Sequence, residues 1–314
     1  MRLINAFKIA VNNYALIFKN LVYKVIVFLL FTAVVGLILK VRIKPVYEQF
    51  RPVLAELKKI FLSLADGTLS AQTVSLKSTF VAFVEYLSEN VGSIVLTVAI
   101  VVIAFYLFRF FSGVSDAVLM ILVNDYMSSL SRMRYLSVLA ENLKRILVYQ
   151  LIDALISLVW DALIVTVGYF LFIGVLELVP LASVFVTGTL LVFAFAVKQT
   201  CMSQIMANIL IAGDKPAAAI GKGLRLGKQN FFRMLSTYFT TSVLLLYLGI
   251  TVSLFTAGIG DLIFLPFASL FIVCLKQVDY FVNNKKKYFI DYDTIIVPKE
   301  LRENDEQLLS DVDI

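Results

Sequence analysis

Two carboxylates inside a long apolar stretch are the residues best placed to do chemistry. Asp153 and Asp161 lie in the apolar segment 147–176, and Trp160 precedes the second of them. A carboxylate inside a lipid bilayer costs roughly 2.5–3.5 kcal/mol, so its side chain is expected to face the protein interior and to find a partner. Lys198 on the next apolar segment lies within about 3 Å of Asp161 in depth, counted from the turn that joins the two segments. We therefore predict an ion pair between Asp161 and Lys198.

Two alternatives remain open for these residues. In one, Lys198 extends its chain to the membrane surface, and Asp161 is protonated or hydrogen-bonded to a serine or threonine. In the other, the ion pair forms, and it either binds a substrate or a proton or only holds two helices together. Side chains on opposite faces would contradict the pair.

Other catalytic chemistry has little support in the composition. The chain of 314 residues has no histidine, which excludes histidine-based zinc sites and Ser-His or Cys-His nucleophile pairs. Its two cysteines, Cys201 and Cys274, are interpreted as small apolar packing residues. Because the sequence has no nucleotide loop, metal cluster or nucleophile motif, we expect a protein without its own catalysis, cofactor or metal.

One short motif has a catalytic parallel. The residues Gly258-Ile259-Gly260-Asp261 resemble the GxGD motif of presenilin-type intramembrane aspartyl proteases. Those enzymes need a second aspartate, close enough to share a proton. Asp153 and Asp161 are predicted toward the opposite side of the membrane, so a tight glycine-based turn explains the motif better.

The elements that position these residues are predicted to be membrane-spanning helices. Hydrophobic residues make up 60% of the chain and its mean hydropathy is +0.90, whereas soluble domains are about 45–50% apolar. About 20 apolar residues in a helix cross a hydrocarbon layer of about 30 Å, and apolar runs without alternation favour helices over barrel strands. We predict an all-α integral membrane protein with six spans, at about 22–40, 91–111, 147–176, 181–201, 236–257 and 262–281.

Basic residues lie mostly on one side of these spans. They cluster before the first span, between the second and third, between the fourth and fifth, and after the sixth. Because basic loops stay in the cytoplasm, both termini are predicted to be cytoplasmic. The segment 41–90 also contains basic residues and is placed outside, because five acidic residues offset them and loops of this length constrain orientation less. The net charge of +6 is thus typical of a membrane protein and does not indicate nucleic-acid binding.

The outer segment 45–90 is predicted to be a helical hairpin inserted between the first two spans. Apolar residues recur at helical spacing from Tyr47 to Leu64 and again from Val74 to Val91, and Asp66-Gly67 is interpreted as the turn between two arms. The arms either pack on each other, lie in the outer leaflet, or form a docking surface or gate over the bundle.

The sequence contains a threefold internal repeat. Three similar amphipathic segments, rich in Lys, Arg and Asn, precede the odd-numbered spans, and each has an Asn just before its span. The unit is an interfacial helix, a span, a short outer turn and a returning span, and the three copies form a membrane domain over residues 1–287. Such repeats are common in transporters, where a site often lies between them. The segments are Phe7 to Lys24 with Asn13, Tyr135 to Leu151 with Asn142, and Ile220 to Tyr238 with Asn230.

The segment from Ala217 to Leu235, AAAIGKGLRLGKQNFFRML, and the repeat pattern together carry a family resemblance. The chain resembles a broad set of poorly characterised bacterial polytopic membrane proteins. Among them is the membrane domain attached to some glycerophosphodiester phosphodiesterases. The resemblance implies a membrane domain alone. The phosphodiesterase catalytic domain has no counterpart in this sequence, so neither its activity nor its site residues carry over.

The cytoplasmic face is predicted to contact anionic lipid headgroups, at about 1 kcal/mol per basic residue near the surface. The tail 288–314 is acidic, with eight acids from Asp291 onward against Lys299 and Arg302. We expect it to extend into the cytoplasm with little structure, either as a solubilising tail or as a docking segment. The predicted lipid contacts are Lys222, Arg225, Lys228, Lys285, Lys286 and Lys287.

Transport of a small or lipidic substrate through the three-repeat bundle is the leading functional interpretation. A membrane scaffold or accessory subunit of a larger envelope complex is the alternative, with a partner bound through the outer hairpin or the acidic tail. An intramembrane enzyme ranks third. Transport predicts that Asp161→Asn abolishes activity while expression survives, whereas a scaffold tolerates that change and is sensitive in the hairpin or tail.

Overall fold

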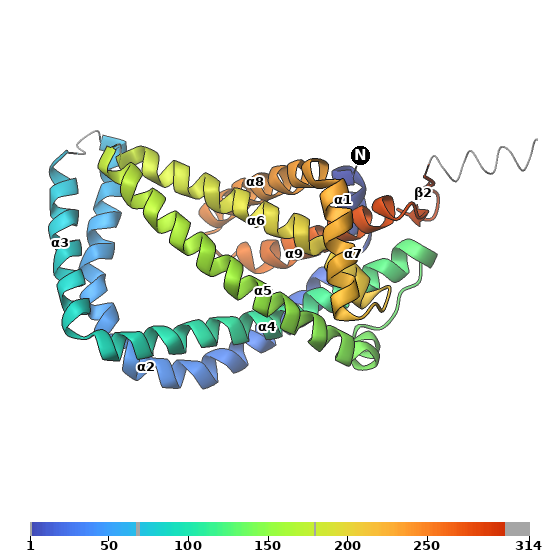
Figure 1. Ribbon diagram of the computed structural model, residues 1–314, viewed down its shortest axis with the longest axis horizontal. Coiled ribbons are helices and arrows are strands. Elements are labelled where there is room, and N and C mark those ends of the chain that lie inside the picture. The colour runs from blue at the N-terminus through green and yellow to red at the C-terminus, as the bar shows by residue number, and fades with distance from the viewer. Residues whose placement is uncertain (1, 67–69, 179, 299–314) are drawn as a thin grey trace, which may run out of the picture. The chain divides into compact units, whose positions relative to one another are not determined.

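The computed structural model describes residues 2–66, 70–178 and 180–298, which are almost entirely helical. This confirms the predicted all-α class. Two very short strands follow the last helix. In chain order the elements are α1 (Arg2–Asn12), α2 (Ala15–Asp66), α3 (Ser70–Glu89), α4 (Val91–Ser129), α5 (Tyr135–Leu178), α6 (Pro180–Leu210), α7 (Pro216–Gln229), α8 (Phe231–Phe255), α9 (Asp261–Asn283), β1 (Tyr288–Phe289) and β2 (Ile295–Ile296) (Figure 1).

Six of the described helices contain a stretch long and apolar enough to cross a membrane, as predicted. The helices themselves are longer than the predicted spans. The second span is expected to end at residue 111, whereas α4 continues to Ser129. Helical hydrogen bonds continue through polar residues, while hydropathy marks only the apolar part. The six stretches are Ala15–Ala33, Val91–Ser129, Tyr135–Gly174, Phe185–Leu210, Phe231–Phe255 and Asp261–Asn283.

The three asparagines that precede the odd-numbered spans differ in whether a helix ends beside them. Helices break at Asn13, between α1 and α2, and at Asn230, between α7 and α8. Asn142 instead lies inside α5, and its amide donates to the carbonyl of Val138 at 3.1 Å. The separate interfacial helix expected before the third span is therefore part of one continuous helix. The residues that follow Asn142 are Leu, Lys, Arg, Ile and Leu, most of them strong helix formers, and they carry the helix onward.

Residues Ile26–Arg109 form one compact unit, here called the hairpin unit. It holds most of α2, all of α3 and the first half of α4. The rings of Phe28 and Phe108 lie 6.3 Å apart, and those of Phe50 and Phe83 lie 5.1 Å apart. Aromatic contacts at these distances join α2 to α4 and α2 to α3.

The predicted outer hairpin begins differently from the expectation. α2 runs without interruption from its apolar stretch through Pro45 and Pro52 to Asp66, so the first arm is not a separate helix. Proline inside a helix removes a backbone hydrogen bond and bends the axis, and Figure 1 shows α2 changing direction within the hairpin unit. The second arm is α3, which begins at Ser70. Residue 67 of the predicted turn lies outside the described residues.

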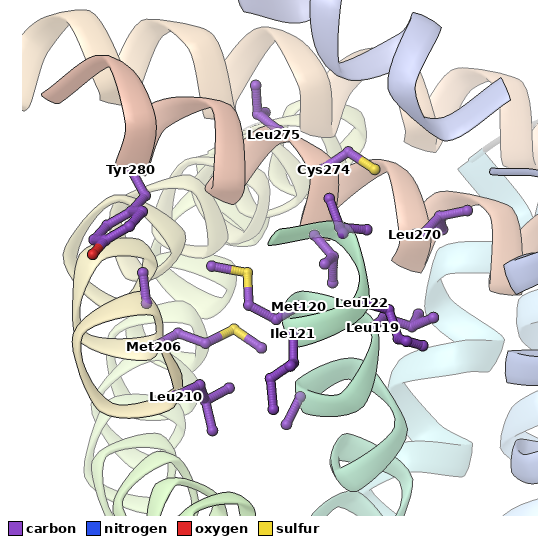
Figure 2. Packing of buried hydrophobic residues seen from close by; sticks show 14 of the residues in the cluster. Leu119, Met120, Ile121, Leu122, Met206, Leu210, Leu270, Cys274, Leu275 and Tyr280 are labelled. Carbon is purple, nitrogen blue, oxygen red and sulfur yellow. The ribbon is translucent and has the colours of Figure 1, made fainter. Parts of the chain in front are cut away.

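The other compact unit, here called the core unit, combines Met1–Val25 with Phe110–Ile314. Its buried residues come mainly from the C-terminal parts of α4, α6 and α9. Figure 2 shows Met120, Met206 and Cys274 among the side chains that fill the space between these three helices. α1 packs on α9, and α7 packs on α6. The apolar core therefore lies toward the ends of the spans that the sequence predicts to be cytoplasmic.

Small residues allow α7 to approach α6 closely. Ala219, Gly223 and Gly227 are spaced four residues apart and form the buried face of α7. A methyl group built at Gly223 would lie 2.6 Å from Cγ1 of Ile205 on α6. No larger residue fits at this position without moving Ile205.

The start of the acidic tail is folded, contrary to the expectation of little structure. β1 and β2 form an antiparallel pair in which Tyr288 faces Ile296. The Tyr288 side chain is almost fully buried and accepts a hydrogen bond from the Asn5 amide at 2.8 Å. Burial raises the pKa of Tyr288, so its hydroxyl stays neutral. Residues 299–314 of the predicted tail lie outside the described residues.

Candidate functional site: a lysine and carboxylate cluster between two candidate spans

α5 presents three polar side chains on one face. Asp153, Ser157 and Asp161 are spaced four residues apart, so they lie along the same side of the helix. α5 packs closely against α6, and Lys198 belongs to α6. Both helices are among the six with apolar stretches long enough to cross a membrane. The four residues are here called the Lys198 cluster.

The geometry brings these four residues together. The Lys198 ammonium donates a hydrogen bond of 2.6 Å to Ser157 Oγ and lies 3.7 Å from Asp161 Oδ1. Ser157 in turn donates to Asp153 Oδ2 at 3.4 Å. The structure thus places Asp161 and Lys198 in contact, as the depth argument predicts. Ser157 was not predicted, although a serine midway between two aspartates on one helical face is a visible signal.

The burial of its side chains determines how strongly the charged groups of this cluster interact. Lys198 is 7% exposed and Ser157 is fully buried, whereas the Asp161 side chain is 31% exposed. The Lys198 side chain is thus largely enclosed by protein, and its ammonium contacts side chains of α5. The cluster holds two carboxylates against one ammonium, so it has one more negative than positive group when all are ionised. An arrangement of this kind can exchange a proton or accept a cationic or hydrogen-bonding group.

Trp160 adjoins the cluster in sequence but points elsewhere. Consecutive residues of a helix differ in direction by about 100°, so the indole does not share the face of Asp161. Its Nε1 is buried and has no hydrogen-bond partner among the described residues. An unpaired buried N–H is unfavourable in an apolar environment, which makes this group a candidate donor to a bound molecule.

A second charged cluster joins three helices and was not predicted. The Lys24 ammonium of α2 lies 2.9 Å from Asp116 Oδ1 of α4 and donates to Ser269 Oγ of α9 at 3.1 Å. Ser269 donates to the same Asp116 oxygen at 2.5 Å. The predicted second span ends at residue 111 and so leaves Asp116 outside the membrane. For this reason the sequence did not predict the pair of Lys24 with Asp116. The available signal was an aspartate in the apolar continuation of the second span.

A third pair is buried more deeply than the two clusters above. Arg2 Nη1 of α1 donates to Asp279 Oδ1 of α9 at 2.5 Å, and the two side chains are 9% and 0% exposed. Gln204 on α6 is also fully buried, and neither of its amide atoms has a partner among the described residues. No spacing rule connects Arg2 with Asp279, because 277 residues separate them.

No family model, curated protein or solved structure matches the chain. Its function is therefore inferred from its own residues and their geometry.

The predicted GxGD motif forms a turn between α8 and α9. Gly258 has a φ of +84°, a left-handed conformation that favours glycine. The Gly260 N–H donates to Thr256 Oγ1 at 2.8 Å, and Asp261 begins α9, where a carboxylate is favourable at a helix N-terminus. These observations confirm the glycine-based turn.

The predicted lipid-contacting residues are exposed. On α7, Lys222, Arg225 and Lys228 lie away from the buried glycine face, and Lys222 forms an exposed ion pair with Asp214 at 2.9 Å. The three lysines 285–287 are exposed as well, and the Lys286 ammonium lies over the Tyr280 ring. Contact of these groups with anionic lipids remains a prediction.

Proposed function

We propose that this chain moves a small or lipidic substrate across a bacterial cytoplasmic membrane. The observation that carries the proposal is the Lys198 cluster between α5 and α6. A nearly buried lysine there contacts Asp161 and Ser157, and the same serine bonds to Asp153. Ionisable groups at membrane depth are costly and are kept mainly where they serve a substrate, ion or proton pathway. A purely structural contact between two apolar helices needs no charges.

The distribution of charged pairs supports a repeat-based bundle. Lys24 on the first span pairs with Asp116 on the second, and Asp161 on the third span pairs with Lys198 on the fourth. Each pair thus joins the outgoing and returning helix of one predicted repeat, with the signs exchanged. Transporters built from repeats often bind their substrates between such units.

A reconstitution experiment tests the proposal. Purified protein is placed in liposomes that contain a trace of fluorescent, NBD-labelled phospholipid, and dithionite added outside quenches every label that reaches the outer leaflet. We expect the wild type to expose inner-leaflet label faster than protein-free liposomes. Asp161→Asn is expected to slow this movement by about tenfold or more, the factor that 1.4 kcal/mol of lost interaction produces.

Asp214→Asn is the matched control. It removes the same charge from the exposed pair with Lys222, outside the cluster, and is expected to leave the rate unchanged. Equal rates for all three proteins and for protein-free liposomes would exclude a lipidic substrate. A wild-type rate that both variants retain would assign the movement to a path without the cluster.

The alternative of a membrane scaffold has its own support in the hairpin unit. Several apolar residues on its arms are exposed, among them Tyr47, Phe80 and Val84. Apolar surface of this kind contacts lipid or a partner protein. A scaffold would tolerate Asp161→Asn in every assay and would lose its partner when these residues are made polar.

A further inference from the structure

An open apolar groove lies between α6, α8 and α9, separate from the charged clusters. It has a volume of about 670 Å³ and is lined almost entirely by apolar atoms. α6 contributes Leu191 and Phe195, α8 contributes Leu246 and Ile250, and α9 contributes Leu265. Its size is within the range of about 300–1,000 Å³ that small-molecule sites occupy.

The groove faces outward, and its lining belongs to helices that can cross a membrane. Leu246, Ile250 and Leu265 are 51%, 52% and 63% exposed, so apolar side chains border an unfilled space. All three helices carry the apolar stretches assigned as candidate spans. In a bilayer, the surroundings of such a groove are hydrocarbon chains of lipids.

Polarity varies along the groove. Asp261 and Ser253 line the end next to the turn between α8 and α9, whereas the far end is lined by Ala268, Ile272 and the uncharged Ser242, whose hydroxyl donates to the Tyr238 carbonyl of its own helix. Asp261 supplies the charge among the lining residues. A ligand that matches this pattern has a long apolar chain and a cationic group at one end.

We propose that the groove binds one acyl chain of a membrane phospholipid whose ammonium headgroup contacts Asp261. The apolar chain alone gives little preference, because hydrocarbon tails are about as apolar as the leucines of the groove. The charge-assisted hydrogen bond from an ammonium to the Asp261 carboxylate supplies the selectivity. Phosphatidylethanolamine has this chemistry, and anionic phosphatidylglycerol does not.

The test counts retained lipid. The full-length protein is reconstituted in nanodiscs with equal amounts of phosphatidylethanolamine and phosphatidylglycerol, released into a mild detergent and analysed by native mass spectrometry. We expect one retained lipid per protein, with phosphatidylethanolamine preferred by about tenfold. Asp261→Asn is expected to keep a bound lipid but to bring the ratio of the two lipids close to one.

Substitutions at two leucines on α8 distinguish binding in the groove from binding on the general lipid-facing surface. Leu246 lines the groove, and Leu244 lies outside it with a similar exposure of 49%. Leu246→Trp fills the groove and is expected to reduce retained lipid about tenfold, while Leu244→Trp retains it. Ile250→Trp serves the same purpose if Leu246→Trp does not fold.

Three results would overturn the inference. These are equal retention of both lipids by the wild type, equal loss in Leu246→Trp and Leu244→Trp, and a dimer that Leu246→Trp alone dissociates. The last result would assign the groove to a second copy of the chain. Because bound lipid is counted without any flux, the outcome is independent of the proposed transport function.

Discussion

The Lys198 ammonium is almost out of contact with solvent, so its stabilisation depends on the polar groups around it. Ser157 accepts its short hydrogen bond, while Asp161 lies farther away and balances its charge. A buried ion pair gains little over apolar packing, but removing one partner leaves an uncompensated charge. Removing Lys198 leaves Asp153 and Asp161 without an opposing charge, whereas removing Asp161 still leaves Asp153 in the cluster. The loss of Lys198 is therefore expected to cost more than the loss of Asp161.

A double-mutant cycle on the Lys198 cluster measures this dependence. Lys198→Met and Asp161→Asn are each expected to lower the free energy of unfolding, and the double variant to lose less than their sum. We expect a coupling energy of about 0.5–3 kcal/mol, measured by unfolding in mixed detergent micelles.

The exposed pair Lys222 and Asp214 provides the comparison, with an expected coupling of about 0–1 kcal/mol. Additive effects of Lys198→Met and Asp161→Asn would contradict an energetic pair in the membrane.

At this scale, the sequence predicts contacts between residues whose depth can be counted from a shared turn. Asp161 and Lys198 satisfy that condition, since one hairpin joins their helices. Lys24 and Asp116 do not, because the long hairpin unit separates their helices in sequence. Arg2 and Asp279 come from opposite ends of the sequence and depend on how the whole bundle packs.

At the scale of elements, α7 packs closely on α6 because the glycines on its buried face have no side chains. Gly223 lies close to Ile205, while Gly221 of the same helix has open space around it. The two glycines have similar helical conformations and different surroundings, so they isolate the effect of packing.

Alanine substitutions of these two glycines are expected to act in opposite directions. Gly223→Ala forces the new methyl group against Ile205 and is expected to cost about 1–3 kcal/mol. Gly221→Ala improves helix propensity without a clash and is expected to stabilise by up to about 1 kcal/mol. The thermal midpoint of each variant in detergent measures both effects, and a destabilised Gly221→Ala with an unaffected Gly223→Ala would contradict the packing.

Hydropathy predicts which elements exist better than where they end. Apolar windows located all six candidate spans, whereas the ends of α2 and α4 lie well beyond them. Helix ends depend on capping and on tertiary packing of polar segments, which a window does not measure. The pair β1 and β2 was missed because two-residue strands leave no periodicity to detect.

The whole molecule has a predicted orientation, with both termini in the cytoplasm. In a background of Cys201→Ser and Cys274→Ala, single cysteines at Ile259→Cys and Lys286→Cys report the two sides. Ile259 is 72% exposed in the turn between α8 and α9, and Lys286 follows α9. We expect a membrane-impermeant maleimide to label Ile259→Cys on intact cells and Lys286→Cys only after permeabilisation. The reverse pattern would invert the topology and with it the assignment of the basic face.

The Arg2 and Asp279 pair can form only after nearly the whole chain has been synthesised. At about 5–20 residues per second, the carboxylate that Arg2 needs is made about 14–55 s later, because 277 residues separate the two. During this interval α1 lacks its docking surface on α9, and its apolar face of Ala6, Ile9 and Ala10 is without its final cover. Before it packs on α9, an amphipathic helix of this kind is expected to lie in the membrane interface. Closure of α1 onto α9 is thus a late step of assembly, and it marks a chain whose last span has already been inserted.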